Sequence, residues 1–271
     1  MSEGGFEALF AQRRQEGRLA LLPWLMAGYP SPDLMIELVA AMAEAGADGF
    51  EVSVPFSDPI ADGPTVQRAN QHALDRGVTP ADAIGLVARA RARVDRPIAL
   101  MGYFNPILRY GLDRYCRDAE AAGASALIVP DLPPEEAAEL AEATRRGGLD
   151  LVAFVAPTTS PERLKAVGRT ASGFIYCVSL TGVTGARAEL AEGLDDLLGS
   201  IRAVTATPVV VGFGISRPEH VAWLRGRADG AIVASALIDR IERAEGDPVA
   251  AAAEFVRALR AAADGAASPA G

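Results

Sequence analysis

The sequence predicts an α/β protein, a single (β/α)8 TIM barrel, and two observations carry the prediction. Short apolar segments alternate with alanine-rich segments of helical spacing along almost the whole chain. This alternation indicates a parallel sheet whose strands are buried on both faces. About eight such units fit into roughly 250 residues, which is the usual size of this barrel. A doubly wound open sheet is the alternative, but no G-x-G-x-x-G follows the first strand.

The eight expected strands are apolar runs bounded by turn residues. They are 19–28, 48–54, 97–103, 126–131, 149–157, 173–179, 208–214 and 230–236. Pro, Ser, Thr or Asp precedes many of the helices between them, and Gly often follows. Two helices are additional to the barrel: an N-terminal helix at about 5–17 and an extra helix after strand 2 at about 64–76. We expect one domain over residues 1–260 and a disordered tail over 261–271, which is rich in small residues.

Composition narrows the class of protein. The chain has 271 residues, of which 50% are hydrophobic, and a formal net charge of −9, which argues against a nucleic-acid partner. Cys116 and Cys177 lie far apart without a CxxC pair, as is typical of a reduced, cytoplasmic protein. The apolar run at 19–26 is short and contains Pro23, so it fits neither a signal peptide nor a membrane helix.

Strand 2 carries an acid inside an apolar run, and two more acids follow it. Because side chains alternate across a strand, Glu51 and Ser53 share one face, and the larger residues at 50, 52 and 54 share the other. The larger set suits the helix-covered outside, which directs Glu51 into the barrel. A buried carboxyl has a raised pKa, although an internal ion pair or hydrogen bond is the alternative. Asp58 and Asp62 lie in the loop that opens onto the catalytic face, and turn chemistry explains Asp58 equally well.

Three later strand ends also carry polar or glycine-rich segments. Tyr176 on strand 6 faces either the interior or the helices, and the long segment 179–190 after it suits a lid or is an ordinary long loop. VGFGIS (211–216) follows strand 7, and AIVASA (231–236) runs from strand 8 into a helix. Loops 7 and 8 form the recurrent phosphate site of this barrel, where backbone N–H groups hold the anion.

Other chemistries lack their residues. The one lysine, Lys165, lies in a surface helix pattern, so a Schiff-base mechanism has no inward lysine. His72 and His220 lie in separate helical segments without metal-ligand spacing, and we expect no metal site. Acid–base chemistry by carboxyl groups remains, with a phosphate as the part of the substrate that is held.

These motifs resemble the tryptophan synthase alpha subunit family. EVSVPFSDPIADGPTVQ (51–67) is similar to the family's strand-2 signature, close to E-L-G-x-P-F-S-D-P-x-A-D-G-P-x-x-Q. Segments 100–111, 126–136, 173–187 and 210–216 also match, and the resemblance covers about residues 5–260. It implies a lyase of tryptophan biosynthesis that splits indole-3-glycerol phosphate into indole and glyceraldehyde 3-phosphate.

The resemblance also implies roles for single residues. Glu51 matches the acid–base glutamate, Asp62 the carboxylate that holds the indole N–H, and Tyr176 the tyrosine beside the reacting centre. The remaining substrate contacts it implies are Gly185, Phe213, Gly214, Ala234 and Ser235 at the phosphate, Leu100 and Leu127 at the indole, and Thr184 in the lid. Three residues depart from the family pattern: Ser53 and Ala234 replace glycines, and Leu180 stands where some members have arginine.

Finally, the family implies a partner, the pyridoxal-phosphate-containing beta subunit of an alpha2beta2 assembly, with no cofactor in this chain. The expected contact residues are Pro55 and Asp58 in the strand-2 loop and Asn105, Ile107 and Leu108 in a loop at 105–111. For Ile107 and Leu108 local packing is an equal alternative. Two further functions compete with the lyase. One is a catalytically weak barrel that mainly activates a partner. The other is a different phosphate-binding barrel enzyme, such as an indole-glycerol-phosphate synthase, which would use an inward lysine.

Overall fold

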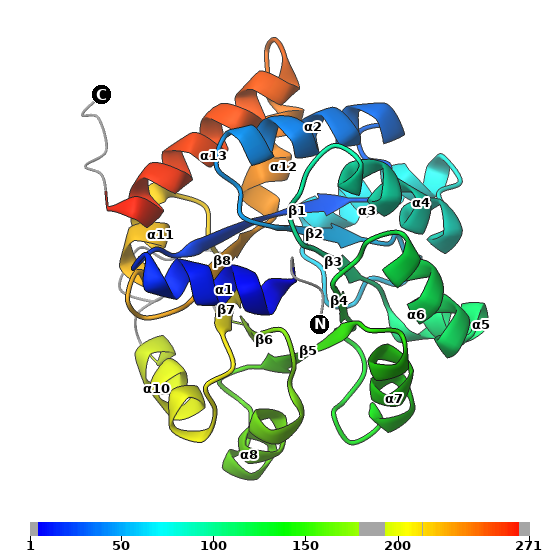
Figure 1. Ribbon diagram of the computed structural model, residues 1–271. Coiled ribbons are helices and arrows are strands. Elements are labelled where there is room, and N and C mark those ends of the chain that lie inside the picture. The colour runs from blue at the N-terminus through cyan, green and yellow to red at the C-terminus, as the bar shows by residue number, and fades with distance from the viewer. Residues whose placement is uncertain (1–4, 179–192, 213, 266–271) are drawn as a thin grey trace.

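Eight parallel strands close into a barrel in the computed structural model, which describes residues 5–178, 193–212 and 214–265 (Figure 1). The strands follow one another around the barrel in chain order, and the last pairs with the first. Their bounds are β1 Ala20–Met26, β2 Phe50–Ser53, β3 Ile98–Met101, β4 Ala126–Ile128, β5 Asp150–Val155, β6 Ile175–Val178, β7 Val209–Gly212 and β8 Gly230–Val233. The predicted (β/α)8 barrel is confirmed.

Helices surround the barrel on all sides (Figure 1). In the described ranges they are α1 Phe6–Gln15, α2 Pro32–Glu44, α3 Pro64–Asp75, α4 Pro80–Arg91, α5 Phe104–Tyr110, α6 Leu112–Ala121, α7 Ala138–Arg146, α8 Pro161–Thr170, α10 Leu194–Val204, α11 Pro218–Leu224, α12 Ser235–Glu242 and α13 Pro248–Asp264. The two additional helices that the sequence predicts are present as α1 and α3. Proline stands within the first two positions of several helices, where its missing N–H costs no hydrogen bond.

The strand register divides the apolar residues into two cores. Val52 pairs with Leu100, and Leu100 with Leu127, and all three pack against the helices in the outer core. The residues that alternate with them, among them Met101 and Ile128, form the inner core. One residue of register therefore decides whether a side chain meets a helix or the barrel interior.

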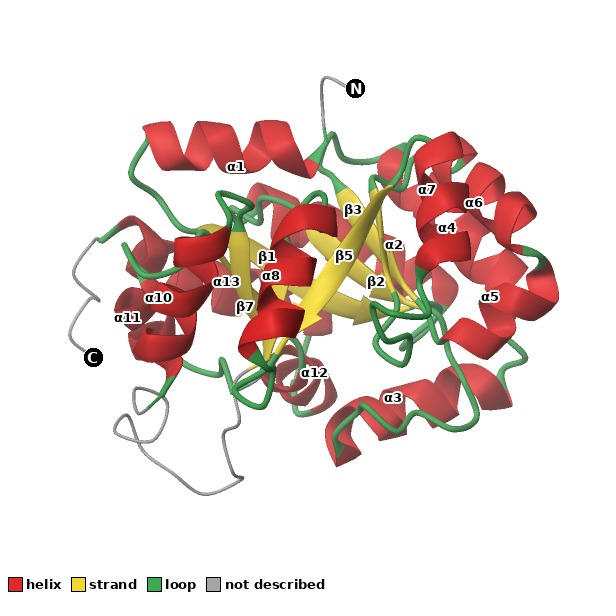
Figure 2. Cartoon of the chain, turned by 90° about the horizontal axis from the view of Figure 1, so that it is seen from below, coloured by secondary structure: helices red, strands yellow, loops and turns green. Residues whose placement is uncertain are grey.

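The N-terminal helix closes one end of the barrel. The rings of Phe6 and Phe10 lie edge-on to Phe174, with centroids 5.2 and 5.8 Å away, and all three belong to the inner core. Figure 2 shows α1 at one end of the strands and α3 at the other. The closed end carries the N-termini of the strands. The opposite end, on the side of α3, is therefore the catalytic face of the barrel.

A buried charge cluster ties α1 and α13 to the closed end. Asp48, 3% exposed, accepts hydrogen bonds from Arg13 Nε at 3.0 Å, from Arg260 Nη1 at 2.7 Å and from the Leu21 N–H at 2.8 Å. Gly46 has φ +106, and a Cβ there would lie 2.7 Å from the Arg260 side chain, so this position requires glycine. The cluster satisfies a carboxylate that burial would otherwise make costly.

The same cluster explains why the chain departs from the predicted tail. Helix α13 continues to Asp264, four residues beyond the boundary expected at residue 260. Ala263 is fully buried, and Asp264 pairs with Arg18 at 2.7 Å and with Arg260 at 2.5 Å. These contacts stabilise a last helical turn that small residues alone would not hold. Residues 266–271 lie outside the described ranges.

The structure also differs from the sequence-based expectation at the segment 105–111, which was expected to be a loop. The structure places residues 105–110 in helix α5, which ends at Tyr110 and is followed by the C-cap Gly111 with φ +96. Pro106 falls in the first helical turn, where its missing N–H has no helical partner to lose. The Phe104 N–H donates to the Asp131 carboxylate at 2.9 Å, which satisfies one of the free amides of this turn.

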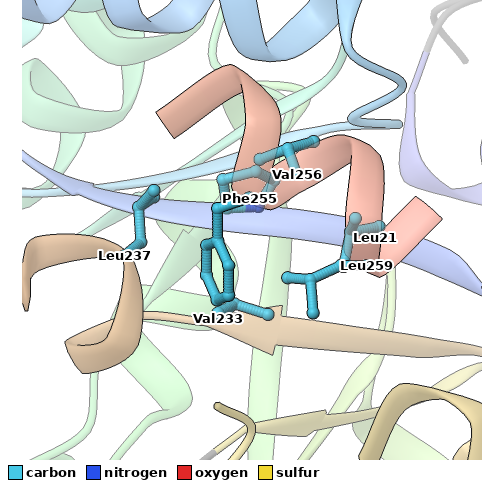
Figure 3. A pocket seen from close by; sticks show the side chains of 7 residues that line it. Leu21, Val233, Leu237, Phe255, Val256 and Leu259 are labelled. Carbon is cyan, nitrogen blue, oxygen red and sulfur yellow. The ribbon is translucent and has the colours of Figure 1, made fainter. Parts of the chain in front are cut away.

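An apolar gap lies between the outer face of the barrel and helices α12 and α13 (Figure 3). Its lining consists only of Leu21, Pro23, Val233, Leu237, Phe255, Val256 and Leu259. Among the described residues none presents a polar side chain to this gap to orient a ligand, so the gap is a packing feature of the wall and lies apart from the catalytic face.

We expect Asp48→Asn to lower the free energy of unfolding by about 3 kcal/mol or more, because it leaves two buried guanidinium groups without a full counter-charge. Urea unfolding measures the change. Asp95→Asn is the matched control, since the Asp95 side chain is 99% exposed in its pair with Arg91, and we expect a change within about 0.5 kcal/mol. Equal effects of the two substitutions would contradict the structural role of the cluster.

Candidate active site

The carboxyl group of Glu51 lies inside the barrel, and none of the described residues forms an ion pair with it. Glu51 is 3% exposed, and its strand neighbours Trp24 and Ala99 belong to the inner core. Its Oε2 has no hydrogen-bond partner among the described residues, so the alternative of an internal ion pair is not observed there. Burial, and secondarily the charge of Asp62, raises the pKa of Glu51 to about 8. The group therefore keeps its proton at neutral pH and can donate it.

Asp62 lies at the mouth, at the end of the loop that leads into α3. Burial raises the pKa of Asp62 to about 6, while a hydrogen bond from Tyr103 Oη at 3.3 Å opposes the rise. At neutral pH this carboxyl is therefore ionised while Glu51 is protonated. Two acids whose environments separate their pKa values are able to take different roles in one reaction.

Three side chains position the loop that carries Asp62. Asn70 on α3, 3% exposed, accepts from the Phe56 N–H at 2.8 Å and donates to the Phe56 carbonyl at 2.7 Å. The Phe56 ring stacks on Tyr103 with centroids 5.0 Å apart, and Tyr103 Oη accepts from the Ala61 N–H at 3.0 Å. The loop is thus bound at both of its ends, and the carboxyl group of Asp62 is held in place by a buried scaffold.

Tyr176 faces the barrel interior, which decides between the two orientations left open by the sequence. It is 6% exposed in the inner core, and its ring stacks on Phe154 with centroids 4.9 Å apart. A Cβ on Gly212 would lie 2.2 Å from Tyr176 Oη, so the missing side chain makes room for the phenol. Burial, and then the charges of Glu51 and Asp62, raises the pKa of Tyr176. The structure thus brings the three predicted catalytic residues within range of one another's charge.

The predicted phosphate site lies in part within the described residues. Gly214, exposed and with φ +74, follows β7, and Ala234 directly precedes α12, which begins at Ser235. Ser235 is exposed at this N-terminus, where free N–H groups favour an anion. Phe213, Thr184 and Gly185, together with the departure Leu180, lie outside the described ranges.

Two predicted indole contacts are wrong. Leu100 and Leu127 are 1% and 0% exposed and pack in the outer core against the helices. Met101 and Ile128 pair with each other on the face that Ser53 shares, in the inner core. The physical reason is the parallel register with β2, which sends Leu100 and Leu127 to the same side as Val52.

The predicted partner contacts divide according to exposure. Pro55 and Ile107 are buried, Ile107 at 1%, so local packing is the correct interpretation of Ile107 and neither side chain offers area to a partner. Asp58 and Asn105 are exposed, and Leu108 is 51% exposed. Ile60, which is not among the contacts expected from the sequence, is 83% exposed in the strand-2 loop.

Sequence reasoning also missed the residues that support the catalytic groups. Tyr103 and Asp131 could have been found, because both come shortly after a strand, where this barrel carries its function. Asn70 and Phe154 show no comparable signal, since each acts through a partner that is distant in the chain, and the glycine-rich segment around Gly212 indicated an anion site rather than room for Tyr176. Their roles depend on contacts that only the folded chain creates.

The described residues place the remaining chemistry-bearing groups elsewhere. Lys165 is exposed on α8, and His72 on α3 contacts the Pro30 carbonyl at 3.0 Å. No group of His, Cys, Asp and Glu residues within the described ranges could hold a metal ion. In these ranges, too, no helix is long and apolar enough to cross a membrane.

A (β/α)8 barrel with two carboxyl groups of separated pKa at its catalytic face defines a barrel enzyme of the acid–base type. The profile of the tryptophan synthase alpha chain family matches residues 10–266. The alpha chain of Roseiflexus castenholzii is 57% identical and that of Chloroflexus aggregans 55%, with 93% and 92% of this chain and 97% and 94% of theirs covered. A crystal structure of the alpha chain from Legionella pneumophila superposes with a TM-score of 0.88 at 34% identity and covers 97% of this chain and 98% of that chain. A structure of tryptophan synthase from Mycobacterium tuberculosis superposes with a TM-score of 0.88 at 37% identity and covers 96% of this chain and 98% of that chain.

The chain belongs to the tryptophan synthase alpha chain family. This family supplies the indole-3-glycerol-phosphate lyase component of tryptophan biosynthesis, so the expected enzyme class and pathway are confirmed. An alpha chain also implies a partner subunit.

The geometry predicts a bell-shaped dependence of kcat/KM on pH, with an acidic limb from Asp62 and a basic limb from Glu51. Activity requires a pH above the pKa of Asp62, about 6, and below that of Glu51, about 8. Tyr103→Phe removes the hydrogen bond that lowers the pKa of Asp62, so we expect the acidic limb to move to higher pH. Steady-state rates across pH 5–9, a range that brackets both limbs, measure the profile.

Tyr110→Phe is the matched control for this substitution. Tyr110 Oη donates to Asp118 at 2.7 Å on the surface of α5 and α6, so its loss should leave both limbs in place. An unchanged acidic limb in Tyr103→Phe would contradict the assignment of that limb to Asp62.

Proposed function

We propose that Glu51 and Asp62 together cleave indole-3-glycerol phosphate to indole and glyceraldehyde 3-phosphate at the barrel mouth. The observation that carries the proposal is the buried Glu51 carboxyl, whose raised pKa of about 8 keeps it protonated at neutral pH. Protonation of indole C3 turns the ring into the electron sink that carbon–carbon cleavage requires. A buried, neutral acid that faces an ionised one is suited to this step.

The proton transfers then balance within the site. Glu51 gives its proton to indole C3, and the positive charge that develops on the ring is stabilised by the Asp62 carboxylate at the indole N–H. The Glu51 carboxylate next accepts the proton of the hydroxyl on the carbon bonded to indole C3. That C–C bond breaks, its electron pair neutralises the ring, and an aldehyde forms. Glu51 ends protonated, as it began, and Tyr176 packs beside the reacting carbons.

The phosphate end of the substrate belongs at the ends of β7 and β8. We assign it to Gly214 and to the N-terminus of α12 at Ala234 and Ser235, joined by Gly185 and Phe213 of the neighbouring segments. Thr184, in the segment 179–190, is a further proposed substrate contact. Met101 and Ile128, rather than Leu100 and Leu127, provide apolar surface for the indole ring, because they face the interior.

The partner proposed for this chain is a beta subunit that contains pyridoxal phosphate, in an alpha2beta2 assembly in the cytoplasm. No cofactor is proposed for this chain itself. Cys116 and Cys177 are buried free thiols, which suits a reducing compartment.

The test is to incubate the purified protein with indole-3-glycerol phosphate and to quantify indole and glyceraldehyde 3-phosphate, with and without a cognate beta subunit. We expect slow cleavage that the partner accelerates, and a loss of at least about 100-fold in Glu51→Gln, because the amide cannot donate and retake a proton. Lys165→Gln is the control, as this side chain is exposed on α8. If no cleavage occurs under either condition while the protein still stimulates the partner, the lyase function is contradicted. The alternative of a barrel that mainly activates a partner then remains.

We propose that the beta subunit binds at a surface that contains two exposed apolar side chains. A hydrogen bond connects the two segments that carry these side chains. Ile60 and Leu108 are the large hydrophobic residues that stand strongly exposed among the described residues. The Ala61 N–H, next to Ile60, bonds Tyr103 Oη, and α5 with Leu108 begins at the following residue. Exposed apolar residues adjacent to polar ones, here Asp58 and Asn105, are typical of an interface.

We therefore expect Ile60→Ser combined with Leu108→Ser to reduce the stimulation by the beta subunit by about tenfold or more, because apolar area at the interface is lost. Titration of the partner against the lyase rate measures it, and the basal rate and thermal midpoint should stay unchanged. Glu254→Ser serves as a surface control, because the side chain of Glu254 is exposed on α13. Undiminished stimulation would place the partner elsewhere.

A further inference from the structure

A second buried polar atom that no described residue contacts by a hydrogen bond lies on the same face of β2 as the Glu51 carboxyl. Ser53 is 1% exposed, and its Oγ has no hydrogen-bond partner among the described residues. The residues that pair with Ser53 on the adjacent strands are Met26 and Met101, both buried in the inner core. A hydroxyl between two thioether side chains has no strong partner within the wall of the barrel.

The position of Ser53 along the strand directs this hydroxyl toward the mouth. Ser53 is the last residue of β2, two residues beyond Glu51, and the two side chains share the inward face. Buried hydroxyl groups in folded proteins nearly always have a partner, and a buried polar group left without one costs free energy. An atom placed in this way is satisfied when a polar group enters the mouth.

We propose that Ser53 Oγ binds a hydroxyl group of the three-carbon chain of the substrate, beside the atom on which Glu51 acts. The inference rests on the proposed function. The other polar groups of the substrate are already assigned: the indole N–H to Asp62, and the phosphate to the ends of β7 and β8. Glu51 acts on the hydroxyl of the carbon bonded to indole C3, so the second hydroxyl of the chain remains. A serine hydroxyl matches it because it both donates and accepts. Ser53 thus becomes a specificity residue for a hydroxylated chain, at a position where the resembled signature has glycine.

The test compares two ligands that differ only in these hydroxyls. Indole-3-glycerol phosphate is the substrate, and 3-(indol-3-yl)propyl phosphate, which lacks both hydroxyls, is the probe that we expect to compete with it. In Ser53→Ala we expect the KM of the substrate to rise about three- to tenfold, the range for one hydrogen bond, while the Ki of the inhibitor stays within about twofold. Ser53→Gly removes the same hydroxyl and should show the same selective loss.

Ser172→Ala is the matched control. Ser172 Oγ accepts from the Leu151 N–H at 3.0 Å before β6, away from the mouth, so its loss should lower the thermal midpoint without changing KM or Ki. A merely structural role for Ser53 would lower the thermal midpoint and weaken both ligands together.

Two further outcomes separate the inference from the function on which it rests. If the unaltered protein cleaves the substrate but KM and Ki change equally, or not at all, in both Ser53 variants, the inference is overturned and the lyase stands. If the unaltered protein neither cleaves the substrate nor binds the inhibitor, the proposed function falls and the inference falls with it.

Discussion

A closed parallel barrel sends every second side chain of each strand into one narrow interior, and the rest of this structure depends on that constraint. Apolar residues fill the interior almost everywhere, with the rings of α1 closing one end. Glu51 occupies one of the inward positions, and its Oε2 has no hydrogen-bond partner in the part of the chain that the structure describes. Its raised pKa follows from the geometry of closure, because the water that would stabilise the charge is excluded.

The two buried acids around β2 show how environment divides structure from chemistry. Asp48, before the strand, meets two guanidinium groups and a backbone amide, and it holds α1 and α13 to the closed end. Glu51, within the strand, meets Trp24 and Ala99 instead. A paired carboxylate fixes the fold, whereas an unpaired carboxyl retains a proton that a reaction can use.

The mouth combines a rigid wall with loops that other elements support. Asn70 on α3 and Tyr103 after β3 hold the loop of Asp62 from two sides, so a connection without regular secondary structure carries a fixed carboxylate. Helix α5, which carries the exposed Leu108, begins directly after Tyr103, whose hydroxyl donates the hydrogen bond that lowers the pKa of Asp62.

Much of this protein follows from the sequence by itself: the eightfold alternation, both additional helices, the inward Glu51 and the acid-rich loop after β2. These features are local, since periodicity within one strand already separates its two faces. Only the tertiary structure decided which face of the neighbouring strands is inward, which exchanges Leu100 and Leu127 for Met101 and Ile128. It also turned 105–111 into a helix, buried Pro55 and Ile107, and extended α13 to Asp264. Register, burial and ion pairing join residues far apart in the chain, and no local pattern encodes them.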